Sequence, residues 1–130
     1  MTVTMNLEIE SGFALDEISQ ALSNFGAELC VDSDGVSGNF RLSNAYFVFR
    51  DSNGLDEVVT EGVAVNWVVG VRGAFHCPID SLEASASEIK LFLNFFSEKK
   101  GCRFILSFQY EIVYAIRDEN GLRFLKEMVG

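Results

Sequence analysis

Alternation of apolar side chains between Arg103 and Arg117 constrains the fold more than any other feature of the sequence. Every even-numbered residue from Phe104 to Ile116 is apolar, whereas the odd-numbered positions include serine, glutamine and glutamate. A period of two residues is typical of a strand that buries one face. We therefore predict a long central strand over 103–117, with Phe108 and the other even-numbered residues buried against helices.

Two other stretches have helical periodicity. In Phe13–Phe25 the apolar residues recur at steps of three and four, and Ser81–Lys99 repeats this pattern over a longer stretch. Such spacing places apolar side chains on one face of a helix. Gly26 and Gly101 follow these stretches and are the expected helix ends.

The remaining elements read mostly as strands. We predict strands over Met5–Ile9, Glu28–Val31, Val36–Leu42 and Ala45–Arg50, one long strand or two over Glu57–Phe75, and a short C-terminal helix carrying Leu122, Leu125 and Val129. The predicted order is β-α-β-β-β-β-α-β-α. It favours a single α+β domain over residues 1–130, in which a mostly antiparallel sheet packs a face carrying Trp67 and Phe108 against two amphipathic helices.

The N-terminus and the cysteines bear on localisation. Met1–Glu10 contains neither a basic residue nor an apolar run, so we expect no signal peptide. No stretch reaches the roughly 20 apolar residues of a membrane-spanning helix. Cys30, Cys77 and Cys102 are widely spaced and odd in number. We therefore expect reduced thiols and a cytoplasmic protein.

Charge is the feature that bears most directly on function. Acidic residues outnumber basic ones 19 to 10, for a formal net charge of −9, which argues against binding to nucleic acid. Residues 1–65 contain eleven acids and two bases, which accounts for the whole net charge. Because binding residues tend to lie on loops, we predict that the acidic turns of this half bind a basic protein partner. These predicted binding residues are Asp32, Asp34, Asp51, Asp56, Glu57 and Glu61.

Two alternatives to this acidic binding surface stay open. Acidic surface charge also serves solubility, without any partner. The other alternative is the polar face of the two long predicted strands, which is flatter and nearly neutral. That face carries Asn66, Arg72, Ser107, Gln109 and Glu111.

Catalytic and metal-binding patterns are weak in this sequence. His76 is the single histidine, and its neighbour Cys77 points to the opposite face of a strand, so we expect no dyad unless the chain turns at Pro78. Glu111 is the best-placed single carboxylate, but an ion pair with Arg72 on a neighbouring strand explains it more simply. The cysteine spacings match no zinc motif. We expect no metal, no cofactor and no catalytic activity.

A resemblance to known protein families rests on the acidic α+β character and length of the chain and on two segments. These segments are Asn66-Trp67-Val68-Val69-Gly70 and Phe108-Gln109-Tyr110-Glu111. The chain resembles small bacterial immunity proteins of polymorphic and contact-dependent toxin systems. This resemblance implies a protein that neutralises a cognate toxin by forming a tight complex through its acidic surface. The chain also resembles the acidic class I chaperones of type III secretion, although these usually begin with their first helix. A small enzyme using Glu111 and His76 is the remaining alternative.

Overall fold

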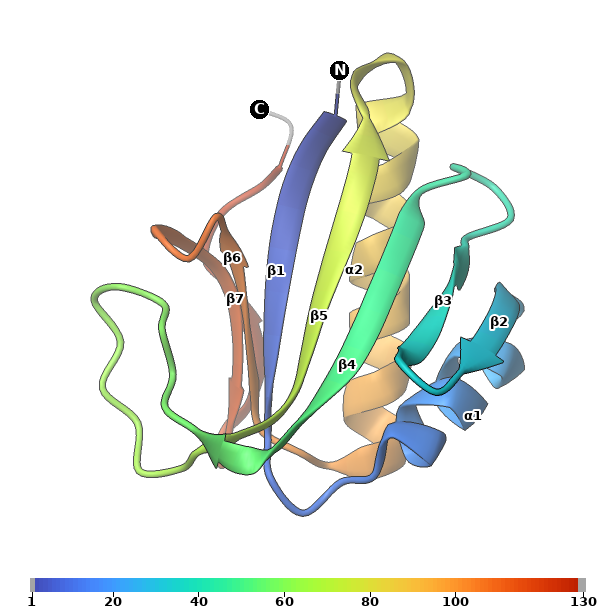
Figure 1. Ribbon diagram of the computed structural model, residues 1–130. Helices are drawn as coiled ribbons and strands as arrows, with labels where there is room; N and C mark the ends of the chain where they lie inside the picture. Colours follow the sequence, from blue (N-terminus) through green and yellow to red (C-terminus); the bar gives the residue numbers. More distant parts are fainter. Residues whose placement is uncertain (1, 129–130) are drawn as a thin grey trace.

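All strands among the described residues belong to one antiparallel sheet, in the order β2-β3-β4-β5-β1-β6-β7-β8 (Figure 1). The computed structural model describes residues 2–128, apart from the side chains of 53–55. The elements are β1 (Thr2–Glu10), α1 (Leu15–Phe25), β2 (Glu28–Asp32), β3 (Gly35–Asn39), β4 (Tyr46–Asp56), β5 (Val69–Pro78), α2 (Leu82–Lys100), β6 (Phe104–Phe108), β7 (Ile112–Asp118) and β8 (Gly121–Phe124).

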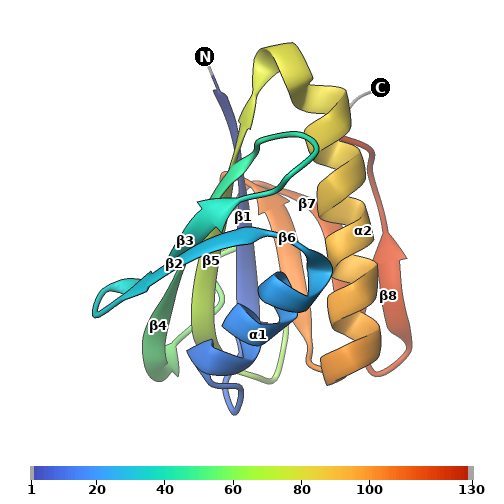
Figure 2. The same cartoon turned by 90° about the vertical axis from the view of Figure 1, so that its right-hand side faces the viewer.

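The sheet curves around the long helix α2. Figure 2 shows α2 running between β8 at one edge of the sheet and β2–β4 towards the other, with α1 beside β2. The expected α+β class, the antiparallel sheet and the two packed amphipathic helices are confirmed. Both helices end as predicted, since Gly26 (φ 104°) and Gly101 (φ 64°) adopt the left-handed conformation that glycine accommodates most easily.

Phenylalanine rings form the centre of the core between the sheet and the helices. Phe40, in the β3–β4 loop, is fully buried and contacts the rings of Phe25, Phe47, Phe75 and Phe92, with centroid separations of 5.1 to 5.9 Å. Aromatic pairs at these separations contribute attraction beyond simple apolar burial. The Phe40 ring therefore links α1, α2, β4 and β5.

The middle of the sheet is buried on both faces. Met5, Leu7 and Ile9 of β1 point to the helices, which places the alternate residue Glu8 on the outer face. Register puts Glu8 between Arg72 of β5 and Ile105 of β6. Glu8 and Ile105 are nevertheless fully buried, because the chain between β4 and β5 covers this part of the outer face.

The prediction of one long strand over 103–117 is wrong in one respect. The structure divides it into β6 and β7, joined by a turn in which the Glu111 amide donates to the Phe108 carbonyl at 2.9 Å. Gln109 and Tyr110 both have positive φ, 53° and 63°, as in a type I′ turn. Phe104 and Leu106 are buried as predicted, but Phe108 is only partly buried, and Ile112, beyond the turn, is 38% exposed.

Two other expectations are also wrong. Residues 57–68 are not strand, because β5 begins at Val69, and Trp67 lies in the loop rather than on the helix-facing side of the sheet. The chain around Leu122 forms the edge strand β8 instead of a helix. Val129, which was assigned to that helix, lies outside the described residues.

Candidate functional site

Residues 57–68, here called the β4–β5 loop, form the candidate site. Figure 1 shows this loop in green, projecting beyond the sheet on the side away from α2. It crosses the outer face of β1 and β6, where Thr60 contacts both Glu8 and Ser107. Loops carried by a rigid scaffold are common places for binding residues.

A buried carboxylate fastens the first half of the loop. Glu8 accepts hydrogen bonds from the amides of Val59 (2.8 Å) and Thr60 (3.1 Å) and a short one from the Thr60 hydroxyl. The Arg72 guanidinium completes the set, with Nη1 at 2.7 Å from Glu8 Oε2. A buried charge is tolerated when it is paired and hydrogen-bonded in this way.

Arg72 also connects the loop to the β6–β7 turn. Its Nη2 donates to the Glu57 carbonyl at 2.8 Å, and its guanidinium lies 5.8 Å from the centroid of the Tyr110 ring. The Tyr110 carbonyl accepts the Glu61 amide at 2.8 Å. Burial lowers the pKa of Arg72, but the hydrogen bond and charge of Glu8 together with the interactions of Tyr110 outweigh burial and leave the pKa raised, so Arg72 stays protonated.

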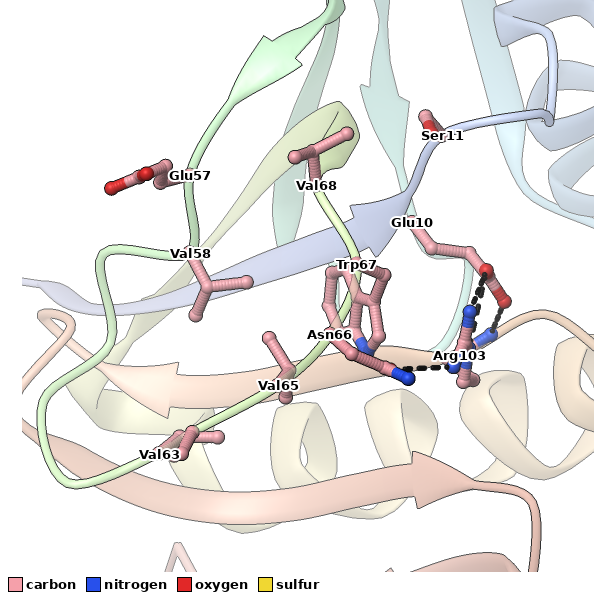
Figure 3. Close-up of a pocket in the computed structure, with 11 residues that line it drawn as sticks. Glu10, Ser11, Glu57, Val58, Val63, Val65, Asn66, Trp67, Val68 and Arg103 are labelled. Atoms are coloured by element: carbon pink, nitrogen blue, oxygen red, sulfur yellow. Dashed lines mark hydrogen bonds and ion pairs between the residues drawn. The ribbon is translucent and has the colours of Figure 1, made fainter.

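A second arginine fastens the far end of the loop. Arg103 donates to Glu10 Oε1 from Nε (3.2 Å) and Nη2 (3.0 Å), and its Nη1 donates to Asn66 (3.0 Å) and Glu119 (2.8 Å). Figure 3 shows the bonds to Glu10 and Asn66 beside Trp67. The hydrogen bond to Glu10 is the main cause of the raised pKa of Arg103.

The loop segment Val63–Trp67, here called the ridge, separates two hollows. One hollow has a volume of about 640 Å³ and extends to Glu10 and Glu57, and the other has about 590 Å³ and extends to Arg123. Three valines of the loop are unusually open to solvent for apolar side chains, with Val59 55% exposed and Val65 and Val68 each 37% exposed. The loop therefore presents apolar surface between two hollows lined by charged groups.

The predicted acidic residues divide between two places. Asp56, Glu57 and Glu61 gather at the β4–β5 loop, where Asp56 and Glu57 share a shallow hollow with Arg72 and Tyr110. Asp32 and Asp34 lie in the β2–β3 turn, in which Asp32 Oδ1 accepts the amides of Asp34 and Gly35. Asp51 lies within β4, opposite Val71.

The excess of acidic residues in the first half of the sequence is partly neutralised in the folded protein by basic residues of the second half. Glu8 pairs with Arg72, Glu10 with Arg103, and Glu17 with Lys100 at 3.9 Å. Asp56 also pairs with Arg72, at 3.5 Å, so this predicted binding residue already has a basic partner within the protein. The acids of the loop without an ion pair among residues 2–128 are Glu57 and Glu61.

Glu111, His76 and Cys77, the residues considered for catalysis, lie in three different environments. The predicted Arg72–Glu111 ion pair is wrong, because Arg72 pairs with Glu8 and Asp56 while Glu111 is exposed in the β6–β7 turn. His76 Nδ1 lies 3.1 Å from the Thr4 hydroxyl, and the His76 ring stacks on Tyr46. Cys77 is buried on the opposite face of β5, as expected.

The competing polar strand face is not a continuous surface. Asn66 lies in the β4–β5 loop, Ser107 is fully buried beneath that loop, and Gln109 and Glu111 lie in the β6–β7 turn. Arg72 remains on the outer face, but its guanidinium donates a hydrogen bond to Glu8. The flat, neutral surface expected from these five residues is therefore absent from the described part of the chain.

The residues that shape this site were largely absent from the predicted binding set. The exposed valines belong to the run at 58–71, whose alternation predicts a strand, so their presence on a loop is invisible to periodicity. Glu8 is a charged residue between Leu7 and Ile9, and a charge inside an apolar strand is the available signal for a buried ionic contact.

Residues 2–128 lack two kinds of feature. No helix there combines the length and apolar character needed to cross a membrane. In the same residues, no three histidine, cysteine, aspartate or glutamate side chains are grouped closely enough to hold a metal ion.

Thiol reactivity is expected to differ between the three cysteines. Burial raises the pKa of Cys77 to about 11 and that of Cys102 to about 12, whereas Cys30 is exposed. Because the thiolate is the reactive form, one thiol should react rapidly with a disulfide reagent such as Ellman's reagent at pH 8, and two should react only after unfolding. Rapid reaction of all three thiols in the folded protein would contradict this burial.

Comparison of the chain with protein-family models, with curated proteins and with solved structures finds no significant match.

Proposed function

We propose that this chain is a binding protein that neutralises a cognate bacterial toxin by forming a tight complex with a basic surface of that toxin. The observation that carries the proposal is the composition of the β4–β5 loop. Its solvent-exposed valines lie next to Glu57 and Glu61, which are exposed and have no ion pair among the described residues. Docking through this loop places the acidic groups at the edge of the complex.

This arrangement has the features of a protein interface. Interfaces commonly have an apolar centre that is dry in the complex and a polar, solvated rim. Val65 and Val68 provide apolar centre, while Glu57 and Glu61 provide a rim of one charge. A rim of one charge steers an oppositely charged partner and fixes its orientation.

The polar groups of the site favour binding over chemistry. Glu8 is occupied by two backbone amides, a hydroxyl and a guanidinium, and Glu10 is occupied by Arg103. General acid–base catalysis requires a group that can reach a substrate proton. These carboxylates instead hold the loop in place, which supports a role in recognition.

Charge reversal on the loop is expected to slow association with the toxin. The double variant Glu57→Lys/Glu61→Lys should reduce the association rate constant by tenfold or more at 0.05 M salt, and the difference should shrink at 0.5 M salt because of screening. The measurement is surface plasmon resonance or stopped-flow mixing with a basic toxin domain, which is to be sought in the genes next to the one that encodes this chain.

A control with the same change in net charge separates local from global effects. Glu83→Lys/Glu98→Lys reverses two exposed charges on α2, away from the loop. This control should change the association rate much less than the loop variant. Equal rates for both double variants and the unmodified protein, at every salt concentration, would contradict the proposed function.

A further inference from the structure

We infer that the β4–β5 loop is a preorganised, convex docking element held in shape by Glu8, and that it inserts into a concave cleft rimmed by lysine or arginine on its protein partner. This inference rests on the proposed function and specifies the partner surface. Glu8 is on this account a positioning residue, because it is buried beneath the loop and does not contact the partner.

The loop is fastened on both sides of residues 62–65. Near its start the amides of residues 59 and 60 bond to Glu8, and the next amide, that of Glu61, bonds to the Tyr110 carbonyl. Near its end Asn66 accepts from Arg103, and the Val68 carbonyl accepts the Ser11 amide at 2.8 Å. A loop with this many attachments loses little conformational freedom when it binds.

The side chains that the loop presents are themselves stiff. Valine is branched at Cβ and has few accessible χ1 rotamers, so Val63, Val65 and Val68 are largely ordered before a partner arrives. The ridge stands between its two hollows, which gives this part of the surface a raised profile. A raised, rigid, apolar surface is complementary to a cleft rather than to a flexible peptide.

The acidic residues of the loop indicate which charge the rim of the partner's cleft carries. Glu57 and Glu61 are exposed on the loop without an ion pair among the described residues, so each can meet a lysine or arginine of the partner. Opposite charges across an interface favour one partner and one orientation. We therefore assign the occupant as a basic toxin whose cleft, rather than an outlying surface, receives the ridge.

A second buried carboxylate provides a matched control for Glu8. Glu88 of α2 is 6% exposed and accepts the amides of Leu42 (3.1 Å) and Ser43 (2.8 Å) and the Ser43 hydroxyl (2.7 Å). It therefore fastens the β3–β4 loop in much the same way as Glu8 fastens the β4–β5 loop. The two loops differ in that only the β4–β5 loop carries the proposed interface.

The first experiment uses the protein alone and compares Glu8→Gln with Glu88→Gln by hydrogen exchange. A glutamine cannot satisfy amide donors and a guanidinium together, because its NH₂ group is itself a donor. Exchange of the Val59 and Thr60 amides should accelerate at least tenfold in Glu8→Gln and remain unchanged in Glu88→Gln. Unchanged protection of these amides in Glu8→Gln would overturn the positioning role. If Glu8→Gln does not fold, Thr60→Val removes one donor and serves the same purpose.

The second experiment uses the same basic toxin domain. Glu8→Gln should weaken binding at least tenfold, with most of the change in the association rate constant, whereas Glu88→Gln should bind as the unmodified protein does. Val65→Asp should weaken binding, and the unmodified protein should compete with a small substrate for the toxin's cleft. Tight binding without such competition would overturn the cleft assignment while leaving the proposed function intact, and absence of any binding would overturn both.

Discussion

Replacement of Phe40 by alanine is expected to lower the free energy of unfolding by about 3 to 5 kcal/mol, the range found for large aromatic truncations in protein cores. Phe40 is 1% exposed and contacts four other rings from α1, α2, β4 and β5. Its removal leaves a cavity that these elements cannot close without moving the sheet relative to the helices. Chemical denaturation followed by far-ultraviolet circular dichroism gives the measurement.

Two variants test the reason for this loss. Phe40→Leu keeps most of the apolar volume and should be less destabilising than Phe40→Ala. Phe108→Ala removes the same group from a position that is only partly buried, at the end of β6. If Phe108→Ala proved as costly as Phe40→Ala, the assignment of the core centre to Phe40 would be wrong.

Replacement of Arg72 by methionine is expected to destabilise the protein by about 3 kcal/mol, because it leaves a buried carboxylate without its charged partner. Glu8 is fully buried, and Arg72 provides the contact at 2.7 Å as well as the bond to the Glu57 carbonyl. Methionine keeps an unbranched apolar stem, so the loss reports mainly on the guanidinium. Thermal and urea unfolding measure it.

The matched control is Arg123→Met. Arg123 also forms a short ion pair, with Asp118 at 2.6 Å, but its side chain is 53% exposed. Exposed ion pairs contribute between zero and about 1 kcal/mol, so this variant should be close to the unmodified protein. Losses of equal size for Arg72→Met and Arg123→Met would show that Glu8 does not depend on its buried partner.

Local patterns in the sequence predict the regular elements well. The three-and-four spacing finds α1 and α2, and glycines in the left-handed conformation end both helices. Alternation finds β1 and β6, and aromatic and β-branched residues find β4, but alternation misses the burial of Glu8, Ile105 and Ser107 on the outer face. These elements follow from local geometry, because the period of the apolar residues matches the period of the backbone.

Prediction fails where tertiary contacts determine the backbone. Gln109 and Tyr110 have no turn signature, yet both adopt positive φ. At this turn the Tyr110 carbonyl accepts the Glu61 amide, and the Arg72 guanidinium lies over the Tyr110 ring. The valines at 63 and 65 continue a strand pattern, but the carboxylate of Glu8 draws the chain away from the sheet at residues 59 and 60. No window of neighbouring residues contains such information.

The candidate site is predicted only in part. Asp56, at the end of β4, adjoins Glu57 and Glu61 of the β4–β5 loop, as their spacing of a few residues implies, but Asp32 and Asp34 lie in a separate turn. The ion pairs that neutralise Glu8 and Glu10 join residues from opposite halves of the chain. A count of charge along the sequence therefore overstates the charge that each surface presents.

The central position of β1 determines when the sheet can form. Thr2 pairs with Pro78 on one side of β1 and Met5 pairs with Phe108 on the other, so β1 waits for neighbours that are synthesised much later. Pairings between distant residues require closure of long loops and slow the folding of β-rich domains. During synthesis Met5, Leu7 and Ile9 therefore stay unpaired until β5 emerges, and the alternate Glu8 interrupts their apolar run with a charge that opposes self-association of the nascent chain.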